Sequence, residues 1–243
     1  MSHKNFSLKE GAYLVCDAHY SNLRPELLGL IEAIHSKTLH PTQLILMGDV
    51  FDALFGGVSY TEMQNRKIIR LINEIARFIE VIYLEGNHDF LLKEYFPKIK
   101  VFPMQMQPVS FSFGKKKIVL AHGDFNGSWS YRVYSKLIRN RKIVRVLTLI
   151  DTLFGHKILK KLDAYLAQKN DCKEFEDFKR FVESRKLHEY ESDVFIEGHY
   201  HQNRSFKFED FTYINLGAFA CNQRYFVVKS IQDKELLEER NFL

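Results

Sequence analysis

The chain has 243 residues, of which 46% are hydrophobic, and it carries a net charge of +5. This length suits one domain with a sizeable core, and the composition excludes a disordered or low-complexity chain. The apolar runs are too short and too often broken by charge to span a bilayer, and no apolar signal-like stretch follows the polar first ten residues. We therefore expect a cytoplasmic protein whose contact with a membrane is peripheral.

The three cysteines, Cys16, Cys172 and Cys221, are few, scattered and odd in number. Their spacing matches neither a disulfide framework nor a CxxC zinc site. A reducing compartment is the simplest interpretation.

The first part of the chain alternates between buried strands and amphipathic helices. The pattern predicts strands at 13–16, 43–47 and 81–84, a helix from about Pro25, and a second helix opened by a capping box at Thr61 and Gln64. This alternation indicates a parallel sheet with helices on its faces. Open sheets of this kind usually bind ligands at the carboxyl ends of their strands.

The second part of the chain contains more strands, in two groups. A hairpin is predicted over 109–113 and 116–121, and further strands over 194–196, 206–208, 212–216 and 224–231. Nothing resembles a strand between Phe125 and Glu191, where helical stripes dominate. We predict an α/β sandwich of two mixed sheets flanked by helices, formed by residues 1–124 and 192–243, with a helical cap inserted at 125–191.

The predicted cap holds most of the positive charge. Between Trp129 and Lys161 there are nine Lys or Arg residues and one acidic residue, so this segment carries +8 and the remainder about −3. Such a local basic surface favours an anionic partner: phosphate, a lipid headgroup or nucleic acid. Aromatic and aliphatic residues interleave with the charges, as in interfacial helices. The alternative is a helix packed on the core with a solvated basic face.

Five short motifs rich in metal-ligating side chains follow one another, each just after a strand-like run. They are Asp17-Ala18-His19, Gly48-Asp49-Val50-Phe51-Asp52, Gly86-Asn87-His88-Asp89, His122-Gly123-Asp124 and Gly198-His199-Tyr200-His201. Each motif by itself is usually a turn, but five in one order behind strands are hard to obtain by chance. Together they predict a dinuclear metal site that hydrolyses a phosphate ester or anhydride.

The residue types suggest how two cations are held. Asp49 is the natural bridging carboxylate, and Asn87 offers a neutral carbonyl oxygen. Asp17 and His19 are two residues apart, which in an extended segment places both side chains on one side. Imidazole nitrogens come from His122, His199 and His201.

Mixed nitrogen and oxygen ligands suit manganese, iron or zinc better than calcium, and we expect Mn²⁺. Two such metals about 3.5–4 Å apart lower the pKa of a bound water, which becomes the nucleophile. His88 stands next to a ligand and is positioned to donate to the leaving oxygen or to the developing charge. Asp52 is expected to orient His88 as a carboxylate–imidazole pair.

These motifs resemble those of the calcineurin-like metallophosphoesterase superfamily, whose pattern is DxH, GDxxD, GNH(D/E), a His before Gly, and GHxH. The resemblance implies a first metal held by Asp17, His19, Asp49 and His201 and a second held by Asp49, Asn87, His122 and His199. It also implies that His88 is a catalytic histidine outside the ligand set and that Asp52 pairs with it.

Within this superfamily the chain is similar to the UDP-2,3-diacylglucosamine diphosphatases of lipid A synthesis. The likeness rests on residues 86–92, on His122-Gly123-Asp124, on Leu216-Gly217-Ala218, and on a basic helical insertion that forms a lid over acyl chains in that group. One departure is that His88 stands where the best-known branch has Arg. The chain therefore has the features of a divergent functional equivalent.

The resemblance implies hydrolysis of UDP-2,3-diacylglucosamine to UMP and 2,3-diacylglucosamine 1-phosphate. The partners implied are this lipid-linked nucleotide sugar and, through the cap, the inner face of the cytoplasmic membrane, with no obligatory nucleic acid and no protein partner. Candidate substrate-binding residues are Arg132, Arg139, Lys169 and Lys173. Alternatives are a phosphoesterase acting on nucleotides, phosphoproteins or nucleic acid, and a metal-stabilised membrane scaffold without activity.

Overall fold

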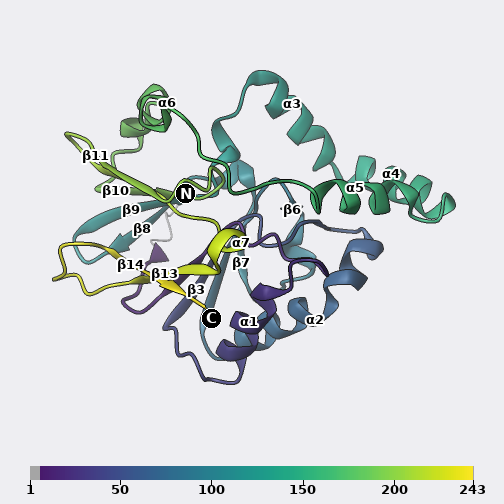
Figure 1. Cartoon of the computed structure of the whole chain (residues 1–243), viewed down its shortest axis with the longest axis horizontal. Coiled ribbons are helices and arrows are strands. Elements are labelled where there is room, and N and C mark those ends of the chain that lie inside the picture. Colours follow the sequence, from purple (N-terminus) through teal and green to yellow (C-terminus); the bar gives the residue numbers. More distant parts are fainter. Residues whose placement is uncertain (1–5, 243) are drawn as a thin grey trace.

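In the computed structural model, which describes residues 6–242, two six-stranded sheets pack against each other with helices on their outer faces (Figure 1). The first sheet has the order β14-β13-β2-β3-β5-β7. Its strands β2, β3, β5 and β7 run parallel, and β13 and β14 add an antiparallel edge. Their bounds are Tyr13–Val15 (β2), Gln43–Met47 (β3), Glu80–Leu84 (β5), Lys100–Phe102 (β7), Arg224–Val228 (β13) and Leu237–Asn241 (β14).

The second sheet has the order β1-β8-β9-β10-β12-β11, in which β9, β10 and β12 run parallel. Its strands are Phe6–Ser7 (β1), Val109–Phe113 (β8), Lys116–Ala121 (β9), Val194–Glu197 (β10), Arg204–Lys207 (β11) and Thr212–Asn215 (β12). A two-stranded sheet pairs β4 (Leu54–Phe55) with β6 (Asp89–Phe90). Short 3₁₀ helices cover Leu92–Glu94, Met104–Met106, Asp124–Asn126 and Leu187–Tyr190.

The alternation of side chains along each strand builds three layers of core. Leu14 and Ile45 point into the space between the sheets, where they pack with Ile118 and Leu120. Their neighbours, such as Leu44, point the other way, towards α1 (Glu26–His35) and α2 (Ser59–Ile75). Each fully buried aliphatic side chain stabilises the fold by about 1.5–3 kcal/mol. The strands β2, β3 and β5 are therefore mostly continuous apolar runs, because both of their faces are buried.

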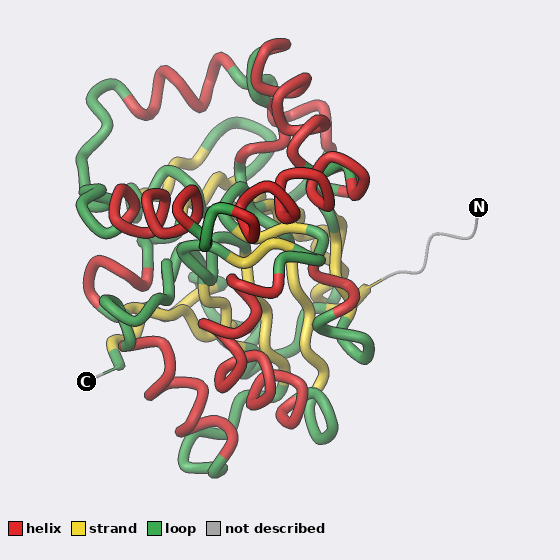
Figure 2. The backbone as a smooth tube through the Cα atoms, turned by 90° about the vertical axis from the view of Figure 1, so that its right-hand side faces the viewer, coloured by secondary structure: helices red, strands yellow, loops and turns green. Residues whose placement is uncertain are grey.

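Four helices follow β9 and precede β10, and we call residues 125–191 the cap. They are α3 (Trp129–Ile138), α4 (Arg141–Leu153), α5 (Lys157–Leu166) and α6 (Phe178–Ser184). Figure 2 shows helices on both sides of the strands, with those of the cap opposite α1 and α2. Asn140 begins α4 by accepting hydrogen bonds from the backbone of Lys142 and Ile143. Gly155, with φ of +64°, follows the end of this helix, as its sequence position predicts.

One local expectation differs from the structure, and two of the observed strands were not predicted. The helix α2 begins at Ser59, so Thr61 is no N-cap, and its hydroxyl instead donates to the Val58 carbonyl at 2.9 Å. The strand β7 is too short to give a clear periodic signal. The strand β14, with sequence LEERN, is an exposed edge, and it is therefore polar and reads as a loop.

The expectation of no disulfide is wrong, because Cys172 of the cap is bonded to Cys221 of the short helix α7 (Phe219–Asn222). The two residues lie 49 positions apart in sequence, and only the tertiary fold brings their Cα atoms to 5.7 Å. The cysteine pattern consequently gives no support for a reducing compartment. Across residues 6–242, none of the helices is both long and apolar enough to cross a membrane.

Candidate metal centre

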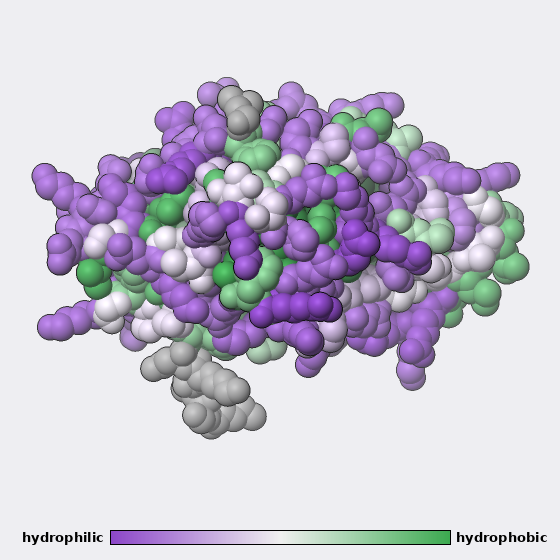
Figure 3. Space-filling model, turned by 90° about the horizontal axis from the view of Figure 1, so that it is seen from below, coloured by the Kyte–Doolittle hydropathy of each residue, from purple (hydrophilic) through white to green (hydrophobic). Residues whose placement is uncertain are grey.

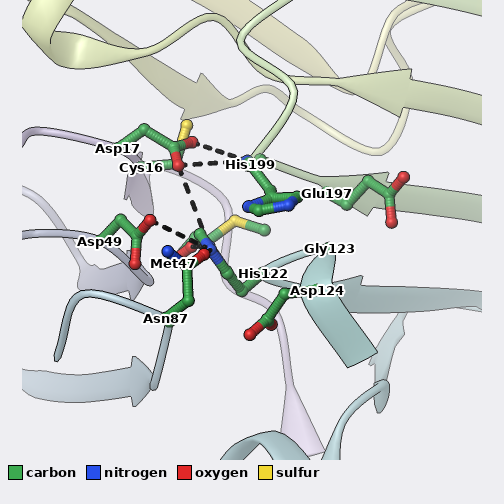
Figure 4. A network of polar contacts seen from close by, with 12 residues as sticks. Cys16, Asp17, Met47, Asp49, Asn87, His122, Gly123, Asp124, Glu197 and His199 are labelled. Atoms are coloured by element: carbon green, nitrogen blue, oxygen red, sulfur yellow. Dashed lines mark hydrogen bonds and ion pairs between the residues drawn. The ribbon is translucent and has the colours of Figure 1, made fainter. Parts of the chain in front are cut away.

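The five motifs lie at the carboxyl ends of β2, β3, β5, β9 and β10, and both sheets present these ends to the same place. Figure 4 shows Asp17, Asp49 and Asn87 from the first sheet facing His122 and His199 from the second. The backbone of Asp17 donates to Gly48 and that of His19 donates to Asp49, which continues the strand pairing into the loops. The sandwich thus assembles the site at one edge of its two sheets.

The candidate ligands form three overlapping clusters in which the ligand atoms lie within 4.8 Å of one another. His201 Nε2 is 3.2 Å from Asp17 Oδ1, and His122 Nε2 is 3.5 Å from Asp49 Oδ2. Asn87 Oδ1 lies 3.3 Å from His122 Nε2. The clusters are Asp17 with His19 and His201, His19 with Asp49 and His88, and Asp49 with His122 and His199.

The donor set fits two divalent cations. His19 is 1% exposed, yet neither of its ring nitrogens has a hydrogen-bond partner. Buried polar atoms are normally paired, so this imidazole lacks an acceptor of its lone pair, which a cation supplies. Asp49 belongs to two of the three clusters, in the position that a bridging carboxylate requires. Imidazole, carboxylate and amide oxygen together favour a transition metal or zinc over calcium.

Backbone carbonyls orient two of the candidate ligand imidazoles. His122 Nδ1 lies 3.0 Å from the Met47 carbonyl, and His201 Nδ1 contacts the Asp171 carbonyl. In both rings Nδ1 donates and Nε2 faces the cluster, which is the usual arrangement of metal-ligating histidines. The carbonyls therefore select the tautomer that a metal needs.

The expected pair between the Asp52 carboxylate and His88 does not form. His88 Nδ1 instead lies 2.9 Å from the backbone carbonyl of Asp52. The Asp52 carboxylate turns towards His19, with Oδ1 3.4 Å from its Nδ1. His88 Nε2 points towards the ligands, 4.0 Å from Asp49 Oδ2. His88 is thus held for a role at the cluster by main chain rather than by a carboxylate.

The two-residue spacing suggested an extended backbone at the candidate ligands. The backbone there is not extended. Asp17, His19 and Asp49 have φ angles of 50°, 47° and 47°, in the left-handed region. His199 and His201 have φ angles of 63° and 58°. Left-handed residues other than glycine are strained, and such strain gathers at functional sites. The side chains converge because the chain turns at each ligand.

Two glycines permit the close approach of the loops. A Cβ on Gly48, whose φ is +83°, would lie 2.4 Å from His122 Nδ1. A Cβ on Gly86 would lie 2.2 Å from Asp49 Oδ1. Neither contact is sterically allowed, so the Gly-Asp and Gly-Asn motifs are needed for packing the ligands together as well as for turning.

Asp89, to which the sequence pattern assigned no role, fixes the loops that carry Asp49 and Asn87. Its carboxylate accepts hydrogen bonds from four backbone N–H groups and from the Tyr83 hydroxyl. The backbone donors are those of Asp49, Val50, Phe51 and Gly86. One feature of the sequence could have predicted this role: Asp89 ends a motif that follows a buried strand. A carboxylate buried there needs several hydrogen-bond donors.

The electrostatics of the cluster favour bound cations. Burial raises the pKa of Asp17, but His201 and His122 outweigh burial and lower it to about 2. Burial and the neighbouring His122 lower the pKa of His199 to about 4, so this ring is neutral and can ligate at neutral pH. Burial and the Asp49 carboxylate raise the pKa of Asp89 to about 7.

Among the predicted substrate-binding residues, Arg139 is the one whose placement favours a structural role. It is 7% exposed, its guanidinium donates to the Gly86 carbonyl at 2.9 Å, and it lies 3.4 Å from Asp124 Oδ2. The Tyr131 hydroxyl donates to the same Asp124 oxygen at 3.0 Å. Arg139 therefore joins the cap to the loops of two ligand motifs. Sequence gave no sign of this buried contact.

The other three predicted substrate-binding residues are exposed. Arg132 lies on α3, away from such buried contacts. Lys169 and Lys173 line a shallow depression that also includes His199 and His201. These two lysines are therefore near the cluster, on its cap side.

A matching family model describes a calcineurin-like phosphoesterase and covers residues 13–203. The chain belongs to the calcineurin-like phosphoesterase family. This family uses a dinuclear metal site, for which the clusters above provide candidate ligands. The family and the residues together support a metal-dependent phosphoesterase.

Relatives of this phosphoesterase include two proteins named UDP-2,3-diacylglucosamine hydrolase. The protein from Haemophilus influenzae strain PittGG is 25% identical over 218 residues, which cover 87% of this chain and 91% of the relative. The protein from Neisseria meningitidis serogroup A is 24% identical over 216 residues, covering 85% and 88%. A solved dimetal phosphatase from Danio rerio has a TM-score of 0.48 at 14% identity, with 96% and 97% of the chains covered.

An apolar groove of the phosphoesterase, with a volume of about 470 Å³, begins at Asn87 and His88 and runs under the cap. Its walls are side chains of the β4 and β6 region and of the helices α3, α4 and α5. The apolar lining residues are Phe55, Val58, Phe90, Ile138, Val144, Leu147, Ile158, Leu159, Leu162 and Leu166. The groove therefore joins the metal centre to an apolar surface.

We predict that Asp89→Asn lowers the free energy of unfolding by roughly 2–4 kcal/mol. The substitution replaces one acceptor oxygen of the carboxylate by an NH₂ group, so some of the surrounding donors lose their acceptor. Urea unfolding monitored by circular dichroism measures this change. Asp193→Asn is the matched control, since Asp193 is exposed and accepts from the backbone of Lys117 at 2.6 Å. Equal, small effects of the two substitutions would contradict the role of Asp89.

A second prediction concerns the metal-free protein. Burial lowers the pKa of His201, but Asp17 outweighs burial and raises it from 6.5 to about 9. The proton on His201 therefore stabilises the fold fully below pH 6.5, and this stability is lost as the pH rises to 9. We expect a loss of up to roughly 3 kcal/mol, measured by urea unfolding at several pH values.

His201→Gln should remove this part of the pH dependence, so the difference between the two proteins isolates it. Saturating Mn²⁺ should also remove it, because metal binding displaces the proton. Parallel pH profiles of the metal-free wild type and His201→Gln would contradict the pairing of His201 with Asp17.

Proposed function

We propose that this phosphoesterase hydrolyses the diphosphate of UDP-2,3-diacylglucosamine, giving UMP and 2,3-diacylglucosamine 1-phosphate. The observation that carries the proposal is the apolar groove, which starts at Asn87 and His88. A nucleotide or phosphopeptide gives no reason for such a lining next to a metal centre. A diacylated sugar phosphate does, because its acyl chains need an apolar site while its diphosphate needs cations.

The polar depression that reaches the cluster at His199 and His201 suits the nucleotide half of this substrate. Lys169 and Lys173 lie there beside His199 and His201. Ammonium groups near the scissile phosphate stabilise its negative charge. The names of the relatives from Haemophilus influenzae and Neisseria meningitidis support the same substrate.

We assign the metal sites as the family resemblance implies. Asp17, His19, Asp49 and His201 hold the first cation, and Asp49, Asn87, His122 and His199 hold the second. Two bound cations, for which we propose Mn²⁺, supply a water of lowered pKa and neutralise phosphoryl charge. The residues of the chain fix the geometry through Asp89 and the carbonyls of Met47 and Asp171.

His88 is the proposed proton donor. Its Nδ1 is held by the Asp52 carbonyl, so its Nε2 carries a proton only in the imidazolium form. The Asp49 carboxylate lies 4.0 Å from Nε2. From this position Nε2 can donate to a phosphoryl or leaving oxygen as negative charge develops there.

We further propose that the cap contacts an anionic membrane surface, at the inner face of the cytoplasmic membrane. Exposed apolar residues of α4 and of the turn after it lie beside basic residues, as in interfacial helices. Figure 3 shows hydrophobic surface at the end of the molecule where Figure 1 places α4 and α5. Leu153 and Phe154 are 75% and 62% exposed, and Arg141, Lys142 and Arg145 are exposed on α4.

The substrate is tested by comparing UDP-2,3-diacylglucosamine in mixed micelles with UDP-N-acetylglucosamine, with release of UMP as the readout. Each buried methylene is worth about 0.8 kcal/mol, so a few methylenes give a preference of about a hundredfold for the acylated substrate. Asp49→Ala should be inactive on both. Equal rates on the two substrates would contradict the acyl-binding groove, and an active Asp49→Ala would contradict the metal assignment.

A groove variant sharpens this test. Leu147→Trp fills the groove and should lower turnover of the acylated substrate about tenfold, while hydrolysis of bis(p-nitrophenyl) phosphate stays unchanged. Met63→Trp is the matched control, because Met63 is exposed, lies on α2 outside the cap and does not line the groove. An equal effect of both variants on the acylated substrate would show that the groove does not hold the chains.

Membrane contact is tested by sedimentation with vesicles that contain phosphatidylglycerol. Replacing Arg141, Lys142 and Arg145 by Gln should weaken binding about a hundredfold, since each basic residue near an anionic surface contributes about 1 kcal/mol. Replacement of Lys179, Arg180 and Lys186 by Gln removes the same charge around α6 and should have little effect. Unchanged vesicle binding of the α4 variant would contradict the membrane contact and would favour a structural role for the cap.

A further inference from the structure

A disulfide lies beside the first metal cluster without belonging to it. Cys172 follows Asp171 in the segment that leads out of α5, and Cys221 lies in α7, so the bond joins the cap to the core. The catalytic roles above make no use of either cysteine. Both partners of the bond are, however, next to residues that position candidate ligands.

On the core side, α7 is attached to the end of β2. The backbone N–H of Phe219 donates to the Cys16 carbonyl at 3.0 Å, and that of Ala220 donates to the Asp17 carbonyl at 3.2 Å. Cys221 is the next residue. Its sulfur is therefore held in a fixed position relative to Asp17.

On the cap side, the segment 169–172 holds the ring of His201. The Asp171 carbonyl accepts from His201 Nδ1, which turns Nε2 towards Asp17. Arg24 binds this segment from the core by donating to the Lys169 carbonyl at 2.9 Å and to the Asp171 carboxylate. The disulfide and Arg24 are thus two ties that keep the Asp171 carbonyl in place.

The bond is accessible to redox reagents. Cys172 is exposed and Cys221 is half-buried, whereas the free thiol of Cys16 is 1% exposed. A reductant in solution therefore reaches the disulfide and leaves Cys16 outside the exchange.

We propose that Cys172 and Cys221 form a reversible thiol–disulfide switch whose oxidised form holds His201 in its ligating orientation. A dithiol reduces the bond: the S–S bond breaks, two thiols form, and the dithiol becomes a disulfide. A disulfide such as oxidised glutathione reverses the reaction by accepting the two electrons. In the reduced form hydrogen bonds alone hold the segment to the core, from Arg24 and between Gln202 and the backbone of Lys173 and Phe175. His201 is then less well ordered and the first cation is held less tightly.

The switch is tested on metal-free protein, air-oxidised or treated with tris(2-carboxyethyl)phosphine. Titration calorimetry with Mn²⁺ should show one of the two sites weakened about tenfold after reduction, the lower end of the effect of losing a partner that orients a ligand. Hydrogen exchange of residues 169–173 and 199–203 should be faster in the reduced form. Oxidised glutathione should restore both properties.

Cys172→Ser and Cys221→Ser should bind Mn²⁺ like the reduced protein and should not respond to the phosphine, which also controls for metal chelation by the reagent. The proposal is overturned if digests of the air-oxidised protein lack the peptide linked through Cys172 and Cys221. Equal Mn²⁺ affinity in the two redox states would overturn it as well. Because neither readout needs turnover, the switch is decided independently of the proposed substrate.

Discussion

The site depends first on one buried carboxylate, Asp89, and on the donors that surround it. Four backbone N–H groups and the Tyr83 hydroxyl converge on its two oxygens, which ties the loop after β3 to the loop after β5. Because Asp49 and Asn87 stand on these loops, Asp89 fixes their relative position, together with the hydrogen bond that the His88 N–H donates to Asp49 Oδ1 at 2.8 Å. A polar network of this kind is stable only when all its members are satisfied.

This arrangement carries an electrostatic cost. Asp17, Asp49 and Asp89 are all buried, and the last two are close enough for Asp49 to raise the pKa of Asp89. Imidazolium groups offset part of the charge, as the lowered pKa of Asp17 indicates. Divalent cations at the candidate site would offset it more fully, and they would accept the lone pair of His19, whose ring nitrogens have no hydrogen-bond partner. The strained left-handed residues at five ligands are tolerated because the surrounding hydrogen bonds determine the loop conformations.

The cap is fastened to the core at points that also position the site. Arg139 reaches the Gly86 carbonyl and Asp124, and Arg185 donates to the Gly123 carbonyl at 3.2 Å and pairs with Glu197. Arg24 and the disulfide hold the segment after α5. The helices α3 and α5, which help to line the groove, are therefore attached at their C-terminal ends to the core next to candidate ligand loops.

Local periodicity was enough to predict the sandwich, since apolar runs such as 43–47 and 116–121 coincide with β3 and β9. The order of the five motifs was enough to identify the family and the candidate ligands, because each motif stands at a strand end and parallel strands present these ends together. Only the tertiary structure decided contacts between segments far apart in sequence. These include the turn of Asp52 towards His19, the burial of Arg139, the hydrogen bonds that converge on Asp89 and the pairing of Cys172 with Cys221. Sequence patterns indicate which face of a helix or strand is buried. They do not indicate which polar side chain from a distant segment contacts that face.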